Sequence, residues 1–228
     1  MDWIFLEYLN KGWCLGYARQ PSTRHFDYAQ WPDGRLPSVA EASTFLNLPM
    51  QFFSFFDLPV RFILDEADLR KRYLSKSKKY HPDFYTMESD AKQAEILQLS
   101  SLNNEAYRTL SDFDQRMKYI LEEKGLLVEG QNEIPKNFLL EMMDINEQLM
   151  ELEFDFDQAV FDAVKQGVES AEKELLDEVE GLIQGYSEEK SGPEELNQIK
   201  NFYLKKRYLL RIKENLSTFA HRRWKNGV

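Results

Sequence analysis

The chain has 228 residues, 43% of them hydrophobic and 14% aromatic, so it is long enough to bury one medium core or two small ones. No stretch approaches the roughly 18 consecutive apolar residues of a membrane span, and the N-terminus lacks the basic start and apolar run of a signal peptide. Because Cys14 is the single cysteine, an intrachain disulfide and a cysteine-based metal site are excluded, and we expect a soluble cytoplasmic protein without metal or cofactor.

Charge is distributed unevenly along the chain. The formal net charge of −10 argues against general nucleic-acid binding. Positions 129–195 hold twenty acidic residues against four lysines, whereas positions 200–225 hold nine basic residues against one acid. These opposite charges favour two helices lying side by side, so we expect the C-terminal basic residues to pair within the chain rather than with nucleic acid.

Residues 1–49 differ in composition from the rest of the chain. They hold three of the four tryptophans, and four prolines interrupt any periodic apolar pattern. A terminal segment without an apolar face has nothing to bury against a core. We therefore expect a poorly ordered N-terminal extension.

The first compact segment begins at Met50 with an aromatic cluster, Phe52, Phe53, Phe55 and Phe56, which we expect to be core. Beyond Leu58-Pro59, Asp65 is a helix N-cap, and the helix should bury Leu69, Tyr73 and Tyr80. Pro82 disfavours helical geometry at His81, so the helix must end at about Tyr80.

A loop is predicted from His81 to about Ser89, followed by a second helix over residues 90–110. Its apolar residues recur at helical intervals, which favours an antiparallel pair with the preceding helix. A shorter third helix is expected to be capped by Ser111 and closed by Gly125.

Residues 126–135 predict a linker, and a second all-helical unit follows it. Breaks near residues 155–157 and 187–193 divide this unit into three helices, each with an apolar seam. The seams are Phe138, Met142, Ile145, Leu149, Leu152 and Phe156; then Val164, Val168, Ala171, Leu175 and Leu182; then Phe202, Leu209, Ile212, Leu216 and Phe219. The spacing predicts a three-helix bundle.

Tyr80-His81-Pro82-Asp83 stands between a basic helix and the run Asn103-Asn104-Glu105-Ala106-Tyr107-Arg108-Thr109-Leu110, an arrangement that resembles a J-domain. With the Phe-Phe-x-x-Phe-Asp-Leu-Pro start, Arg116-x-x-Tyr119-Ile120-Leu121 in the third helix and the acidic helical tail, residues 50–224 resemble the HscB family of J-domain co-chaperones. The resemblance implies two partners: a DnaK/HscA-type chaperone ATPase and an IscU-type iron-sulfur scaffold protein.

The chaperone-binding residues implied by the resemblance are His81, Pro82, Asp83, Arg70, Lys71, Lys76, Lys78 and Lys79. Their chemistry fits, because Pro82 fixes the loop while the Asp83 carboxylate and the basic run offer charge-assisted contacts. A solvated helix face is the plainer interpretation of the basic run. A catalytic dyad of His81 and Asp83 is disfavoured, because the sequence supplies no nucleophile for it.

The first bundle helix predicts a client-binding face. At 100° per residue, Leu139, Leu140 and Met143 lie away from the Phe138 seam, and acidic residues rim them. The plainer alternative is that Leu139 or Leu140 broadens the core contact. The positions matching the family's scaffold-binding surface are Leu139, Leu140, Met143, Asp144, Glu147, Arg207 and Tyr208.

The expected fold is all-α: a J-domain at 50–125, with an antiparallel helical hairpin and a His-Pro-Asp loop, a linker at 126–135, and a three-helix bundle at 136–224 that binds the scaffold. The expected function is a non-enzymatic co-chaperone that stimulates the chaperone ATPase, delivers the scaffold and promotes iron-sulfur cluster assembly and transfer. A general protein-folding J-domain co-chaperone with another client is the alternative. We expect a monomer that binds neither nucleic acid nor membrane.

Overall fold

The computed structural model describes residues 50–128 and 130–226, with the backbone alone for 219–226, so the N-terminal extension lies outside the described residues. The described residues form helices and connecting loops, and the all-α prediction is confirmed. The chain divides between Glu123 and Lys124 into two compact units. The domain limits expected from the sequence remain a prediction.

In the described part of the first unit, the short helix α3 (Gln51–Phe55) comes first. Phe53, Phe55 and Phe56 are almost fully buried, as predicted, whereas Phe52 is half-buried. Phe52 stacks on Tyr119 with 4.6 Å between ring centroids, and its backbone N–H donates to the Tyr119 hydroxyl at 3.2 Å. These contacts join α3 to α6 (Phe113–Glu123).

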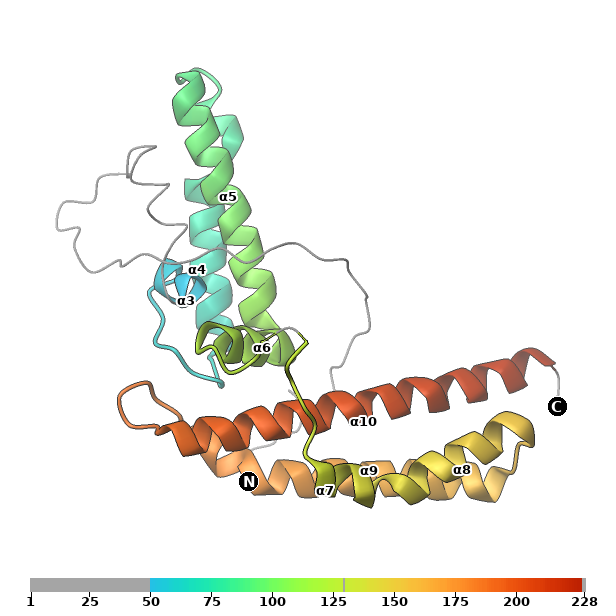
Figure 1. Ribbon diagram of the computed structural model, residues 1–228. Coiled ribbons are helices and arrows are strands. Elements are labelled where there is room, and N and C mark those ends of the chain that lie inside the picture. The colour runs from blue at the N-terminus through green and yellow to red at the C-terminus, as the bar shows by residue number, and fades with distance from the viewer. Residues whose placement is uncertain (1–49, 129, 227–228) are drawn as a thin grey trace. The chain divides into compact units, whose positions relative to one another are not determined.

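Helices α4 (Glu66–Lys79) and α5 (Asp90–Ser111) run side by side in opposite directions (Figure 1). The Asp65 carboxylate accepts from the backbone N–H groups of Ala67 and Asp68, which confirms the predicted cap. Asn103 is 1% exposed on α5, and its side-chain amide donates to the Ser77 hydroxyl at 2.8 Å and to the Tyr73 carbonyl at 3.3 Å. This buried amide fixes the register of the hairpin.

The connections at the two ends of α5 differ in detail from the prediction. The loop after α4 contains a 3₁₀ helix, η1 (Pro82–Tyr85). The expected Ser111 cap of the third helix is wrong: Ser111 is the last residue of α5, and Asp112 caps α6 by accepting from the backbone N–H of Gln115 at 2.7 Å. An aspartate carboxylate competes well for this position, as serine does. Gly125 has φ +68°, in keeping with the predicted helix end.

A buried arginine ties α6 to the rest of the unit. Arg116 is 0% exposed, its Nε donates to the Phe62 carbonyl at 2.8 Å, and one terminal nitrogen donates to the Leu110 carbonyl. Hydrogen bonds from a charged group to buried carbonyls are stronger than neutral ones. Arg116 therefore holds the segment before α4 against the end of α5.

The second unit contains α7 (Lys136–Glu141), α8 (Met143–Phe154), α9 (Gln158–Gly185) and α10 (Pro193–Asn226). The single helix expected from Phe138 to Phe156 is wrong, because Met142 leaves helical geometry at φ −87° and ψ 2°. The Asn146 side chain donates to the Met142 carbonyl at 2.6 Å, and a side chain bonded into the backbone ladder is a known origin of such kinks.

The three-helix bundle of α8, α9 and α10 is confirmed, with the seams buried in part as predicted. In α9, however, Leu182 is half-buried, and Val179 and Ile183 occupy the core in its place. The prediction carried a seven-residue repeat from Leu175 to Leu182, whereas a straight helix drifts about 20° per heptad. Among the other predicted seam residues, Ile145, Phe156 and Ala171 are half-buried, and the Phe219 side chain lies outside those described.

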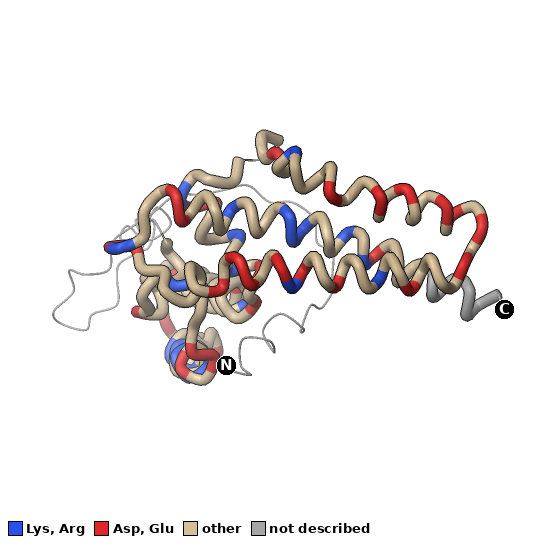
Figure 2. Tube along the Cα trace, turned by 90° about the horizontal axis from the view of Figure 1, so that it is seen from below, with Lys and Arg blue, Asp and Glu red and all other residues tan. Residues whose placement is uncertain are grey.

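Opposite charges do face each other within the bundle. Lysine and arginine gather on α10, whereas aspartate and glutamate gather on α8 and α9 (Figure 2). Lys213 pairs with Glu172, and Lys205 lies 4.0 Å from Glu178. Such partly exposed pairs contribute little stability each, so we infer that they mainly favour this orientation of the helices. No helix in the described part of the chain has the length and apolar character to cross a membrane.

Candidate functional sites

The His81-Pro82-Asp83 loop is exposed at the tip of the α4–α5 hairpin. The His81 and Asp83 side chains are 51% and 81% exposed. Pro82 is the first residue of η1, and His81 Nδ1 accepts from the Asp83 backbone N–H at 3.3 Å. Because Nδ1 is engaged inside the loop, Nε2 is the ring nitrogen presented to a partner.

Hydrogen bonds hold this loop to both helices. The Tyr85 hydroxyl donates to the Lys79 carbonyl at 2.9 Å, at the end of α4. On the other side, the Gln93 side chain donates to the carbonyls of Thr86 at 3.3 Å and Glu88 at 2.9 Å. The loop is therefore preorganised, which lowers the entropic cost of binding a partner.

The predicted basic residues do not form one uniform face. Arg70, Lys71, Lys78 and Lys79 are exposed, whereas Lys76 is half-buried with Nζ 4.7 Å from the centroid of the Phe55 ring. Burial is the main cause that lowers the pKa of Lys76; the Asp57 carboxylate opposes it, and Lys79 and Arg72 add to it. Lys79 Nζ also lies over a ring, 5.3 Å from the Tyr80 centroid, but Lys79 is exposed, whereas Lys76 is half-buried.

Two apolar side chains of the same loop were missed by the sequence reasoning. Phe84 is 68% exposed, with its ring centroid 5.5 Å from that of His81, and Met87 is 98% exposed. The sequence does contain an indication of their exposure, because a phenylalanine and a methionine lie in a segment that Pro82 excludes from the preceding helix. They make the tip of the hairpin partly apolar as well as charged.

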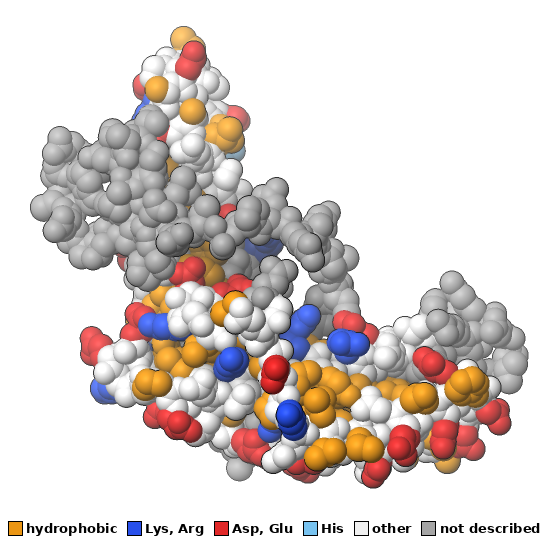
Figure 3. All heavy atoms as spheres, in the orientation of Figure 1, with side chains coloured by type: hydrophobic (Ala, Val, Ile, Leu, Met, Phe, Trp, Pro, Cys, Tyr) orange, Lys and Arg blue, Asp and Glu red, His pale blue; other side chains and the backbone are white. Residues whose placement is uncertain are grey.

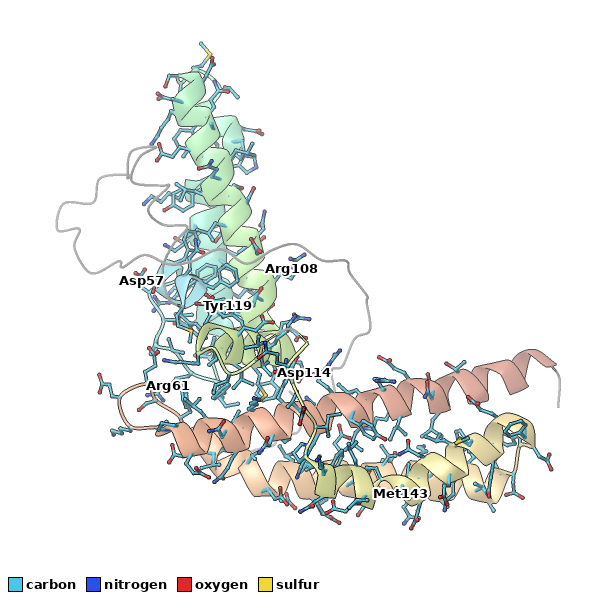
Figure 4. The ribbon with its side chains drawn as sticks, in the orientation of Figure 1. Asp57, Arg61, Arg108, Asp114, Tyr119 and Met143 are labelled. Atoms are coloured by element: carbon cyan, nitrogen blue, oxygen red, sulfur yellow. The ribbon has the colours of Figure 1, made fainter. Side chains whose placement is uncertain are left out.

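On the second unit, the structure places the predicted client residues at the surface. Leu139, Leu140 and Met143 are 37%, 64% and 50% exposed, which confirms that they lie off the seam. Asp144 and Glu147 are exposed beside them. Apolar side chains gather on this face of the unit, and Met143 lies at the junction of α7 and α8 (Figures 3 and 4).

The two predicted residues of α10 have different surroundings. Arg207 is exposed, but Tyr208 is half-buried, with its ring edge-on to that of Phe138 at a centroid distance of 5.7 Å. The Tyr208 hydroxyl accepts from the Asn146 amide at 2.6 Å. Asn146, which the sequence reasoning missed, therefore joins α8 to α10 beside the exposed patch. Tyr208 positions this surface in addition to any contact with a partner.

Comparison with known proteins identifies relatives of this chain. The family model described as the HscB C-terminal oligomerisation domain matches residues 134–217. A co-chaperone protein HscB homologue from Vibrio parahaemolyticus is 32% identical over 139 residues, which cover 56% of this chain and 81% of that protein. The chain belongs to the HscB family of co-chaperones.

Other HscB proteins extend the similarity. The human iron-sulfur cluster co-chaperone protein HscB is 29% identical over 167 residues, covering 72% of this chain and 66% of the human protein. The crystal structure of human co-chaperone protein HscB superposes with a TM-score of 0.56 at 25% identity, covering 92% of this chain and 95% of the other. The all-α architecture of an HscB protein, a J-domain with a C-terminal helical domain, is thereby confirmed.

Proposed function

We propose that this chain stimulates the ATPase of a DnaK/HscA-type chaperone through its first unit and delivers an IscU-type iron-sulfur scaffold protein held by its second unit. One observation carries the proposal: His81, Pro82 and Asp83 are exposed on a loop that hydrogen bonds fix to both helices of the hairpin. The human relative, which is named an iron-sulfur cluster co-chaperone protein, supports the choice of client.

The loop acts on its partner by binding and not by catalysis. A co-chaperone accelerates ATP hydrolysis when it binds the hydrolysing conformation of the chaperone more tightly than the resting one. The Asp83 carboxylate and the His81 ring can make charge-assisted hydrogen bonds in that complex, while Phe84 and Met87 add apolar area. Such a mechanism requires no catalytic group on this chain, so the function that we propose is not enzymatic.

The exposed basic residues of α4 favour an acidic surface on the chaperone. Arg70, Lys71, Lys78 and Lys79 project from the helix that leads into the loop. A basic surface next to a specific loop speeds encounter with an acidic partner and orients it. The remaining member of the run, Lys76, contributes less because its ammonium group lies against Phe55.

The second unit offers the client surface. Leu140 and Met143 are exposed apolar residues rimmed by Asp144 and Glu147, a composition typical of protein interfaces. The same exposed apolar surface would also hold unfolded polypeptide, so a general protein-folding co-chaperone is the second candidate. Titration of the chain with the iron-sulfur scaffold protein and with an unfolded polypeptide separates the two, because the first function requires clear preference for the folded scaffold.

The test of the first function is His81→Gln in a steady-state ATPase assay with the chaperone. We expect stimulation to be lost while the helical content and scaffold affinity stay unchanged, since His81 is exposed and makes no core contact. Thr86→Ala, a substitution of an exposed side chain in the same loop, is the matched control and should stimulate normally. Full stimulation by a folded His81→Gln variant would refute the assignment of this loop.

A further inference from the structure

The outer face of α8 carries an apolar stripe that continues beyond the predicted client residues. Met143, Met150 and Phe154 are 50%, 61% and 89% exposed. They stand at positions i, i+7 and i+11, which places them within about 20° of one line along the helix. From the first to the last, this stripe runs for about 16 Å at 1.5 Å per residue.

Acidic residues accompany the stripe along its whole length. Glu147 lies between Met143 and Met150 on the same face, at about 40° from Met143, with Glu151 at about 80° and Asp144 at about 100°. Glu153 follows the opposite edge, and all four acids are exposed. Helix α8 contains no lysine or arginine, so no basic residue of the helix itself neutralises this face.

We propose that the stripe of Met143, Met150 and Phe154 is a docking surface for a basic, apolar segment of the iron-sulfur scaffold protein. This surface continues about three helical turns beyond the patch of Leu139, Leu140 and Met143. This inference rests on the proposed function. The negative charge beside the stripe indicates the chemistry of the occupant. Apolar side chains of the occupant would cover the stripe, and its lysine or arginine side chains would pair with Asp144, Glu147 and Glu151. An occupant of this length is a helix or an extended strand, not a single anchoring side chain.

A second copy of this chain is a poorer occupant of the same surface. A twofold dimer through this face would place the stripe against itself and its acidic rims against each other, because such an interface uses the same patch on both subunits. Juxtaposed like charges in an interface oppose association. The face therefore favours a partner of opposite charge.

Calorimetric titration of the full chain with the iron-sulfur scaffold protein tests the inference. Met150→Ala with Phe154→Ala should weaken binding about tenfold, whereas alanine at Leu139, Leu140 and Met143 together should weaken it about a hundredfold. Leu97→Ala, an equally exposed apolar residue on α5, is the control and should bind like the wild type. Thermal melts should agree within error for the stripe variant and the wild type, because both stripe residues are exposed.

Charge reversal gives an independent readout of the occupant's sign. Glu147→Lys with Glu151→Lys should weaken binding at low salt, and the difference from wild type should shrink as salt screens the charges. Unchanged or tighter binding by this variant would overturn the basic character of the occupant. Its control is Glu189→Lys, an exposed acid in the loop between α9 and α10.

The outcomes separate this inference from the function on which it rests. If the wild type does not bind the scaffold, the proposed client and the docking surface both fall. If the Leu139, Leu140 and Met143 variant loses affinity but the Met150 and Phe154 variant does not, the longer surface alone is wrong. Sedimentation that shows a wild-type dimer and a monomeric stripe variant would assign the stripe to self-association and would also overturn the inference.

Discussion

Two consecutive asparagines on α5 allow the hairpin contact to be tested with a matched pair of substitutions. Asn103 is buried and donates from its side-chain amide to Ser77 and Tyr73 on α4. Asn104 is exposed and accepts from the Tyr73 hydroxyl at 3.1 Å. Both substitutions to alanine keep helix propensity high, so the difference between them reports the buried contact.

The expected loss for Asn103→Ala follows from its contacts. Two hydrogen bonds of about 1 kcal/mol each are removed, and the space left by the carboxamide adds a smaller term. Asn103 Oδ1 is itself buried without a hydrogen-bond partner among the described residues, and its removal offsets part of the loss. We expect a net destabilisation of about 2 kcal/mol for Asn103→Ala and below about 0.5 kcal/mol for Asn104→Ala, since exposed contacts contribute less.

Hydrogen exchange of the α4 and α5 amides measures this difference within the first unit. A loss of about 2 kcal/mol lowers the protection of amides that exchange by full opening of the unit by about thirtyfold. Amides of α9 and α10 supply the internal reference. Equal protection in the Asn103 and Asn104 variants would refute the conclusion that the buried amide fixes the hairpin. Chaperone ATPase stimulation should fall in parallel with hairpin protection, because the His81 loop is held by both helices.

Two further predictions concern charge. Burial is the main cause that raises the pKa of the Glu123 carboxyl above its usual value of 4.5; the hydrogen bond from the Met50 N–H opposes the rise, and Glu122 adds to it. The folded state therefore holds this proton more tightly than the unfolded state, so stability falls as pH rises from 4.5 through the raised pKa of Glu123. Glu123→Gln keeps an oxygen that can accept from the Met50 N–H. Its melting temperature should be higher than that of the wild type at pH 7 and equal to it at low pH; a lower melting temperature of the variant at pH 7 would contradict this. Replacing Lys78 and Lys79 by alanine should slow chaperone association at low but not at high salt in stopped-flow measurements. Lys76→Ala should slow chaperone association less than the Lys78 and Lys79 substitution does, and it should lower thermal stability more. Equal association rates for all variants at low salt would refute electrostatic steering.

The helices and their order were predictable because strong local signals marked them. Asp65, Pro82 and Gly125 act through capping and backbone restrictions that depend only on neighbouring residues, and the structure places each as expected. The exposure of Leu140 and Met143 was predictable for a similar reason, since helical periodicity alone puts them off the seam.

The predictions from sequence fail where two local signals compete or where a residue contacts another that is distant in sequence. Ser111 and Asp112 are both good caps, and propensity does not choose between adjacent candidates. The kink at Met142 depends on Asn146, which also donates to Tyr208, 62 residues along the chain. The roles of Arg116 and Lys76 likewise depend on Phe62 and Phe55, so periodicity on their own helices gave no sign of them.

Residue type therefore does not separate binding residues from positioning residues at either surface of this protein. Lys76 and Lys78 are two residues apart and carry the same charge, yet one lies against an aromatic ring and the other is exposed. Tyr208 and Arg207 are adjacent, yet the tyrosine is bonded to α8 and the arginine is exposed. Each pair predicts opposite responses: substitution of the exposed member should change partner binding with little effect on melting, and substitution of the contacting member should change both. Comparing the members of a pair thus distinguishes an interface contribution from a structural one where a single variant would not.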